Sequence, residues 1–358
     1  MKLRQITLAL GLMMASAAMA QQFDNAVGWA AVDGMTTGSG NRNPVVVETA
    51  DQLKKVLKGE VPRTIYIKGE IRFEEMLQVS NFSNKTIYGL PGSALVNDTH
   101  YDQQSKDDMT PKEKSGILAI KNCSNVILRN LTFKGPGAYD VDGRDNLFIT
   151  SDSHHIWVDH CDFQDAIDGN LDISNGADYI SVTWCRFRYL KAPYAGGSGG
   201  SDDHRFSNLI GSSDNRVEDE GKLRVTFACC WWDQGCVRRM PRVRFGRVHI
   251  VNCLYNSADA KDCIGVAYKA NVYAEKNAFN KMKYPWKEYA TKKGFTDYNV
   301  TLWDNVGAQN ERKNSGDAEF FNPSKYYQIE TMAPHMVPIT VGNPTEGAGA
   351  TLAIMMRQ

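Results

Sequence analysis

The chain has 358 residues, of which 42% are hydrophobic and 23% are charged, a composition typical of globular proteins. Its 41 basic and 41 acidic residues balance at neutral pH, which excludes a nucleic-acid or membrane binder driven by bulk charge. Thirty glycines and fifteen tyrosines favour a turn-rich β protein over a helical bundle.

The N-terminal segment has the features of a secretory signal peptide. Lys2 and Arg4 precede an apolar run that is too short to span a bilayer and ends at Ala18-Met-Ala20. The run has no polar face, which argues against a buried N-terminal helix. We therefore predict that residues 1–20 are removed and that residues 21–358 form one exported domain, periplasmic or extracellular.

The middle of the chain contains a repeat of nine-residue segments. In each segment the second residue is Val or Ile, the fourth is apolar and the ninth is aromatic. Three of the five steps between successive segments are 23 or 24 residues long. The segments are Asn125–Phe133, His155–Phe163, Tyr179–Phe187, Arg224–Trp232, Arg247–Tyr255 and Asn271–Phe279.

This repeat predicts a solenoid of parallel strands. Alternation of apolar and polar residues within each segment predicts a strand with one buried face. Recurrence after 23 or 24 residues indicates that each strand begins one coil, whereas a propeller blade would require a longer period. The predicted fold class is therefore all-β, a parallel β-helix.

The ends of the chain suit this architecture. Residues 48–57 predict a short capped amphipathic helix, with Leu53 and Leu57 on one face, that would cover the open end of the core. The longest step of the repeat contains a Gly-rich excursion at 195–203. The Pro-containing stretch beyond about Gly316 predicts an irregular covering tail.

Half of the eight cysteines occupy the seventh position of consecutive segments. They are Cys161, Cys185, Cys230 and Cys253, and Asn277 follows them. Equivalent positions in a β-helix stack about 4.8 Å apart, so we predict an internal row of free, buried thiols. Side chains stacked in parallel disfavour disulfide geometry. A packing role is the usual one for buried free Cys, and a redox or metal-binding row is the alternative.

Polar residues recur at similar distances from the starts of their segments and should share one side of the solenoid. They are Asp145, Asp168, Asp172, Lys191, Arg239 and Arg244. Four coils span about 15 Å, which is long enough for a groove that holds a few sugar units. Taken singly, Asp-Gly pairs are usually turns and Arg runs are usually solvated. The prediction of a functional groove therefore depends on all of these residues lying on one side of the solenoid.

These residue types predict a metal ion and an anionic substrate. Carboxylates that face one another repel unless a cation lies between them. An open set of oxygen ligands suits Ca²⁺ better than Mg²⁺, which requires strict octahedral geometry. The basic run at 238–247 favours a substrate rich in carboxylates.

Several separated motifs also occur in a family-specific order between about Phe23 and Phe279. They are Gly28-Trp-Ala, Thr36-Thr-Gly, His155-Ile-Trp-Val-Asp-His160, Asp168-Gly-Asn-Leu-Asp172-Ile, Lys191 and Arg239-Met-Pro-Arg-Val-Arg244. With these motifs the chain resembles polysaccharide lyase family 1, the pectate and pectin lyases. The resemblance implies a right-handed, single-stranded parallel β-helix, in agreement with the repeat. The chain departs from the family in its Cys row, where Asn is common.

The resemblance implies a role for each candidate residue. It implies Ca²⁺ binding by Asp145, Asp168 and Asp172, a catalytic base at Arg239, and binding of substrate carboxylates by Lys191 and Arg244. Asp145 is only three residues from Asp142, which could be the residue that matches instead. The implied enzyme is a monomeric, Ca²⁺-dependent lyase that cleaves α-1,4-polygalacturonate or pectin to 4,5-unsaturated products, without a nucleic-acid or membrane partner.

Other functions stay open at this point. A Ca²⁺-independent pectin lyase acting on methyl-esterified chains would not need the three acids. A hydrolase would need paired carboxylates, and the pair Asp202-Asp203 lies in the Gly-rich excursion without the His or basic partners expected of such a hydrolase. A non-catalytic polyuronate-binding β-helix would not need Arg239. A structural trimer would need trimerisation segments, which we do not find.

Overall fold

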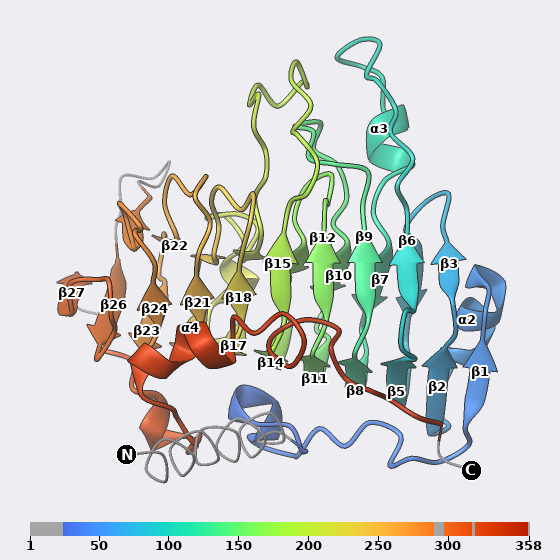
Figure 1. The fold of residues 1–358 in the computed structure, drawn as a ribbon, viewed down its shortest axis with the longest axis horizontal. Coiled ribbons are helices and arrows are strands. Elements are labelled where there is room, and N and C mark those ends of the chain that lie inside the picture. Colours follow the sequence, from blue (N-terminus) through green and yellow to red (C-terminus); the bar gives the residue numbers. More distant parts are fainter. Residues whose placement is uncertain (1–23, 290–296, 317–318, 357–358) are drawn as a thin grey trace, which may run out of the picture.

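The computed structural model describes residues 24–289, 297–316 and 319–356. Three sheets wind around a common core as a right-handed parallel β-helix (Figure 1). Each coil passes through one strand of each sheet in turn, so neighbouring strands in a sheet belong to consecutive coils. The all-β fold class predicted from the repeat is confirmed. The predicted signal peptide lies outside the described residues.

The strands that the structure describes fall into one sheet of eleven and two of eight. Sheet 1 contains β1 (Val45–Val47), β2 (Arg63–Ile67), β5 (Ser83–Gly89), β8 (Ser124–Arg129), β11 (His154–Asp159), β14 (Asp178–Thr183), β17 (Arg224–Ala228), β20 (Arg247–Val251), β23 (Asn271–Glu275), β26 (Tyr298–Trp303) and the antiparallel β27 (Glu311–Ser315). Sheet 2 contains β3 (Glu70–Arg72), β6 (Ala94–Val96), β9 (Thr132–Lys134), β12 (Asp162–Gln164), β15 (Arg186–Arg188), β18 (Trp231–Trp232), β21 (Leu254–Tyr255) and β24 (Ala278–Phe279). Sheet 3 contains β4 (Leu77–Ser80), β7 (Leu118–Lys121), β10 (Leu147–Thr150), β13 (Leu171–Ile173), β16 (Leu209–Ile210), β19 (Arg242–Val243), β22 (Ile264–Val266) and β25 (Trp286–Glu288).

The register of sheets 1 and 2 confirms the predicted repeat. The second residues of the six segments are direct partners in sheet 1: Val126, Ile156, Ile180, Val225, Val248 and Val272. The ninth residues are partners in sheet 2, and their rings stack with centroids 4.3 to 5.6 Å apart: Phe133, Phe163, Phe187, Trp232, Tyr255 and Phe279. Their burial forms a continuous aromatic stack along the core.

The solenoid also has coils that the repeat did not reveal. On the N-terminal side, Ile87 of β5 pairs with Leu128, and on the C-terminal side Val300 of β26 pairs with Val272. In the N-terminal coils the aromatic position is aliphatic, because Leu95 is the register partner of Phe133. The core accepts aliphatic or aromatic side chains at this position, so an aromatic ninth residue identifies only the middle coils of the solenoid.

The predicted row of buried thiols is present. All eight cysteines are free and buried. The backbone N–H of Cys161 donates to Cys185 Sγ at 3.4 Å, and that of Cys230 donates to Cys253 Sγ at 3.3 Å. Asn277 Oδ1 continues the row by accepting from Cys253 N–H at 2.8 Å. The Sγ atoms of Cys185 and Cys253 thus accept a backbone N–H from the preceding coil, as the side-chain amide oxygen of Asn277 does at the end of the row.

A short helix covers the N-terminal end of the core, as the sequence predicts. It is α2 (Ala50–Val56), and Thr49 caps it by accepting a hydrogen bond from Gln52 N–H at 3.2 Å. Leu53 and Leu57 are fully buried against the first coils. Within the described residues, no helix is long and apolar enough to cross a membrane.

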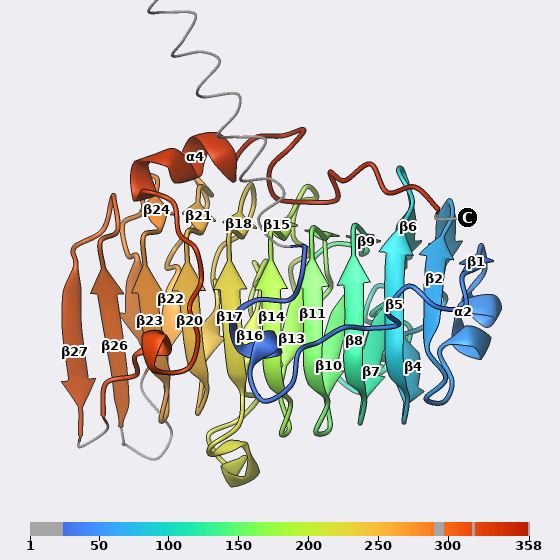
Figure 2. The ribbon, with the colours of Figure 1, turned by 90° about the horizontal axis from the view of Figure 1, so that it is seen from below.

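The two terminal segments lie along the outside of the solenoid (Figure 2). The N-terminal segment places η1 (Gly28–Ala31) across sheet 1, where the buried Trp29 ring lies 4.8 Å from the ring of Tyr326. The C-terminal segment contains η3 (Pro323–Lys325), η4 (Pro334–Met336) and α4 (Val337–Thr340). It is held by hydrogen bonds from solenoid corners, including Asn252 Nδ2 to Met332 O at 2.8 Å.

The connections from sheet 2 to sheet 3 include the long loops that project from one side of the molecule (Figure 1). One of them carries α3 (Thr110–Glu113), and the predicted Gly-rich excursion lies between β15 and β16. A further excursion between β16 and β17 carries η2 (Val217–Asp219). The loops between sheets 2 and 3 form one wall of the site described next.

Candidate active site

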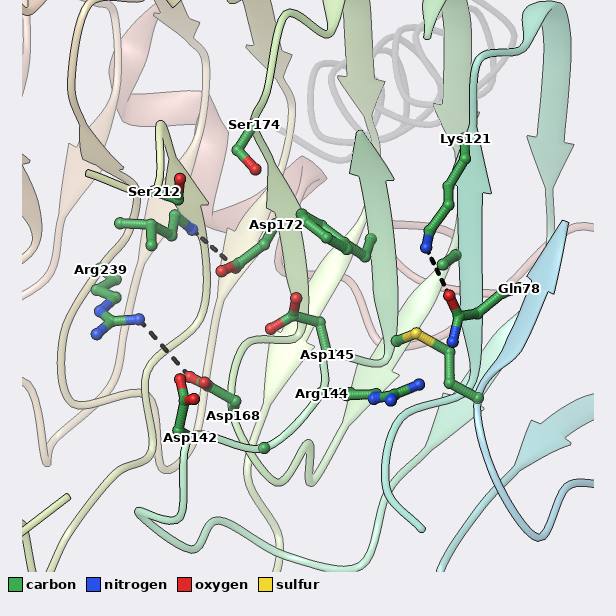
Figure 3. Close-up of a pocket in the computed structure, with 15 residues that line it drawn as sticks. Gln78, Lys121, Asp142, Arg144, Asp145, Asp168, Asp172, Ser174, Ser212 and Arg239 are labelled. Atoms are coloured by element: carbon green, nitrogen blue, oxygen red, sulfur yellow. Dashed lines mark hydrogen bonds and ion pairs between the residues drawn. The ribbon is translucent and has the colours of Figure 1, made fainter. Parts of the chain in front are cut away.

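A groove of about 380 Å³ lies over the outward face of sheet 3, beside the loops that arrive from sheet 2 (Figure 3). Its floor follows one row of register partners on consecutive strands: Asp172 of β13, Phe148 of β10, Ala119 of β7 and Gln78 of β4. Successive positions in this row are about 4.8 Å apart. The groove therefore runs along the solenoid axis.

Three aspartates meet in the middle of the groove, as the sequence predicts. Asp145 and Asp168 stand in the loops before β10 and β13, and Asp172 stands on β13 itself. Asp145 Oδ1 accepts from Gly169 N–H and Asp172 Oδ1 accepts from Leu209 N–H, both at 2.9 Å. These hydrogen bonds hold the carboxylates in place.

Gly169 explains how two of these acids approach each other. A Cβ atom at this position would lie 2.2 Å from Asp172 Oδ1 and 2.8 Å from Asp145 Oδ1. Any side chain larger than hydrogen would collide with both carboxylates. The Asp168-Gly169 pair is thus more than a turn, because its glycine makes room for the acidic cluster.

The acidic cluster raises the pKa of two of its members. Burial, and then the charges of Asp172 and Asp168, raise the pKa of Asp145 well above its usual value. Burial and the charge of Asp168 raise the pKa of Asp172 to about 7. Burial would also raise the pKa of Asp168, but the hydrogen bond and charge of His204, together with Arg239, outweigh it and lower this pKa.

The residues fit a Ca²⁺ ion by donor chemistry. In all three aspartates Oδ1 is engaged by a protein donor, whereas Oδ2 has no donor among the residues that the structure describes. Ca²⁺ takes six to eight oxygen ligands and fills its shell with water or substrate, so three carboxylates suffice as a protein contribution. Among the described residues, no group of three or more His, Cys, Asp or Glu side chains is arranged in the ligand-free structure so that it could hold a metal ion.

Arg239 lies on the C-terminal side of the acids, in the loop before β19. Its Nη1 is 3.7 Å from Asp168 Oδ1, and its guanidinium lies 4.8 Å from the centroid of the Phe206 ring. Its carbonyl accepts a hydrogen bond from Asn208 N–H at 2.7 Å. The backbone of Arg239 is left-handed, with a φ of 57°. The predicted base and the predicted metal ligands thus line the same groove.

The other two predicted residues, Lys191 and Arg244, do not line this groove. Lys191 Nζ donates to Gly135 O at 2.9 Å. Arg244 donates from Nε to Asp214 Oδ1 at 2.8 Å and from Nη1 to Gly211 O at 2.9 Å. Both side chains already have partners in the ligand-free chain.

Asp142 and Asp145 occupy different environments, although only two residues separate them. Asp142 is exposed at the mouth of the groove and forms an ion pair with Lys112 of α3. Asp145 is buried beside Asp172. Of the two, Asp145 is the residue that joins the acidic cluster.

Sequence reasoning missed His204, which bridges two acids. Its Nε2 is 2.9 Å from Asp168 Oδ1, and its Nδ1 is 3.1 Å from Asp140 Oδ1. His204 directly follows the Gly-rich excursion, in the connection between β15 and β16, where no repeat places a residue on a particular face. Sequence reasoning also missed polar residues that line the N-terminal half of the groove, among them Gln78, Lys121 and Arg144.

Comparison with known proteins identifies the family of the chain. Residues 1–349 match the family model described as pectate lyase. A pectate trisaccharide-lyase of Thermotoga maritima is 32% identical over 249 residues, which are 65% of this chain and 58% of that protein. The chain thus matches less than two thirds of that relative's length. Pectate lyase A of Aspergillus niger is 30% identical over 264 residues, covering 72% of this chain and 70% of that protein.

Solved structures share the fold at lower identity. A pectate lyase bound to a hexasaccharide superposes with a TM-score of 0.66 at 22% identity, covering 92% of this chain and 99% of that one. Jun a 1, the major allergen of cedar pollen, gives a TM-score of 0.66 at 20% identity, covering 90% of this chain and 92% of that one. With the family match over nearly its whole length, the chain belongs to the pectate lyase family.

Proposed function

We propose that this protein is an exported, Ca²⁺-dependent pectate lyase that cleaves α-1,4-polygalacturonate by β-elimination. The observation that carries the proposal is the meeting of Asp145, Asp168 and Asp172 with Arg239 in one groove. Family membership supports the reaction class. The predicted signal peptide at 1–20 supports export.

In this proposal Asp145, Asp168 and Asp172 would hold a Ca²⁺ ion. The bound ion would neutralise the substrate carboxylate and thereby acidify the adjacent C5–H. The hydrogen bonds to Gly169 and Leu209 N–H keep the carboxylates of Asp145 and Asp172 oriented. Such fixed orientation lowers the reorganisation required when charge develops in the transition state.

Arg239 removes the C5 proton in the proposed reaction. The electron pair of the C–H bond forms the C4–C5 double bond, and the glycosidic oxygen on C4 leaves, which gives the 4,5-unsaturated end. An arginine base requires surroundings that disfavour the guanidinium cation. Burial, followed by the charges of Arg244 and Arg239, lowers the pKa of neighbouring Arg242 to about 10. The Asp168 carboxylate lies 3.7 Å from Arg239 Nη1 and stabilises the cation while its own charge is not neutralised.

Structural relatives with bound oligosaccharides support the substrate class. One solved pectate lyase is bound to a hexasaccharide, and the lyase of Bacillus sp. N165 is in complex with trigalacturonate. A groove that follows the solenoid axis over several coils provides space for such an extended chain. Lys191 and Arg244 would bind substrate carboxylates after exchanging their present partners.

The test is an assay on polygalacturonate that follows the ultraviolet absorbance of the unsaturated product. We expect absorbance to rise with added Ca²⁺, to stop with chelator and to resume when Ca²⁺ is restored. Activity that persists in chelator and prefers methyl-esterified pectin would replace the proposal with a pectin lyase. Binding without any absorbance change would leave a polyuronate-binding protein.

A further inference from the structure

The groove extends beyond the acidic cluster toward the N-terminal coils. In that direction it passes over β10, β7 and β4, and Figure 3 shows Lys121, Gln78 and Arg144 there, on the side of the acids away from Arg239. Positive groups therefore flank the aspartates on both sides. None of the proposed catalytic steps uses the two cations on the N-terminal side.

Arg144 presents a guanidinium without a protein partner. Its backbone N–H donates to Ser115 Oγ at 3.0 Å, which fixes the main chain next to Asp145. The guanidinium itself forms no hydrogen bond or ion pair with any residue in the described part of the chain. Gly116 leaves space for the base of the Arg144 side chain, because a Cβ atom at position 116 would lie 2.7 Å from Arg144 Cβ. Five N–H donors thus remain available for a ligand.

Lys121 presents a second cation at the end of β7. Its Nζ donates to the neutral Gln78 Oε1 at 2.5 Å, and it forms no ion pair with an acid among the described residues. An ammonium group has three donors, so at least one further acceptor can bind. Gln78 directs this ammonium over the groove without neutralising its charge.

A buried hydroxyl elsewhere in the same groove, on the coil of Asp172, also lacks a partner. Ser174 is only 2% exposed and lines the groove, yet its Oγ has no hydrogen-bond partner in the described structure. It directly follows Ile173, the partner of Ile149, so it continues the row that contains Thr150 and Lys121. An unpaired buried hydroxyl is unfavourable, and a ligand hydroxyl would satisfy it.

We propose that Arg144 and Lys121 form a second carboxylate-binding position for a uronate unit of the bound polysaccharide. The guanidinium binds the carboxylate through paired N–H donors, and the ammonium adds a point charge. Lys121 lies two coils from Asp172, about 10 Å along the axis, so the occupant is a different sugar unit from the one that reacts. Because a methyl ester carries no charge, this position selects unesterified units.

This inference rests on the proposed function, and it is tested with Lys121→Gln combined with Arg144→Gln. On polygalacturonate we expect KM to rise about tenfold, because two charge-assisted contacts are lost, while kcat stays within about threefold. Lys58→Gln combined with Arg312→Gln removes two exposed charges away from the groove and should leave KM unchanged. The increase in KM should shrink at high ionic strength and vanish on oligogalacturonates too short to reach two coils.

Equal KM values for the two double variants would overturn the inference, and so would an equal loss on fully methyl-esterified pectin. If the wild type gives no unsaturated product, the proposed function fails by itself. Calorimetric titration with hexagalacturonate then decides the inference separately. A dissociation constant that is unchanged in the groove variant would reject the position, and one raised about tenfold relative to the control variant would support it.

Discussion

The outward faces of sheets 1 and 3 belong to the same solenoid, yet they differ in whether their polar side chains have hydrogen-bond partners. On sheet 1, Ser181 Oγ accepts from Ala30 N–H at 3.0 Å and donates to Val27 O at 2.5 Å. Thr226 Oγ1 accepts from Trp29 N–H at 3.1 Å and lies 2.8 Å from the hydroxyl of Tyr327. At these two positions the terminal segments satisfy the polar groups that they cover.

On sheet 3 the corresponding partners are missing within the described structure. Ser174 Oγ is buried and unpaired, and Asp145 and Asp172 repel each other. In the loop before β10, the half-buried Arg144 guanidinium also has no partner among the described residues. Buried polar groups in folded proteins are normally paired, so such exceptions mark a place that a ligand completes. Substitutions on sheet 1 should therefore change stability without changing chemistry, and those on sheet 3 should do the reverse.

The strongest test of this contrast is Arg239→Ala. We expect kcat on polygalacturonate to fall by at least about 1,000-fold, because the proposed proton acceptor is lost, while the thermal midpoint changes little. Arg312→Ala, on the exposed antiparallel strand β27, is the matched control and should retain wild-type kcat. A decrease of less than tenfold would remove Arg239 from the role of base.

A second test is Asp172→Asn. We expect the Ca²⁺ concentration for half-maximal activity to rise about 100-fold, because the affinity of such sites depends on ligand charge. In chelator the free energy of unfolding should stay the same or increase, since the substitution removes repulsion between buried carboxylates. The exposed Asp142→Asn should shift the Ca²⁺ requirement less than threefold. A larger effect at Asp142 would exchange the roles of the two acidic positions.

On the covered face, Ser181→Ala should act on stability alone. Two hydrogen bonds to the N-terminal segment are lost, so the free energy of unfolding should fall by about 1–3 kcal/mol, with kcat unchanged. Denaturant unfolding measures the loss, and the exposed Ser105→Ala gives the baseline. An equal change in kcat would contradict the separation between the two faces.

The smallest expected effect concerns His249, which lies under the C-terminal segment. Its ring contacts Tyr327, Glu275 and Tyr273, and burial lowers its pKa although Glu275 partly offsets this. Because the unfolded chain then binds the proton more readily, stability should fall as the pH drops through about 6.5.

We expect this loss to reach at most about 1 kcal/mol between pH 7 and pH 5.5. His249→Gln should flatten this part of the pH profile of the unfolding midpoint. The exposed His335→Gln should leave the profile unchanged. If both variants keep the wild-type slope, another group is responsible for it.

The core could be predicted from the sequence because stacking makes each coil repeat the residue types of its neighbour. Val126, Ile156 and Ile180 are apolar for the same reason, and they became register partners. The N-terminal coils escaped detection because their stacked position contains Leu95 in place of an aromatic ring. Periodicity reveals a coil only where the same kind of side chain recurs.

The site could be predicted only in part. The register of the repeat and the family motifs indicated the three aspartates and Arg239. His204 could not be found this way, because a long excursion without fixed register brings it to Asp168. Arg144 and Lys121 carry no signal other than charge, and the openness of the groove around them exists only in three dimensions.

The row of stacked cysteines provides a way to measure how often individual coils of the solenoid open. Burial raises the pKa of Cys185 and Cys230 far above that of a free thiol, so in the closed molecule neither forms the reactive thiolate. A thiol reagent can reach them only when their coils separate. In a solenoid, neighbouring units can open independently, so the labelling rate of each cysteine would report how often its own coil opens.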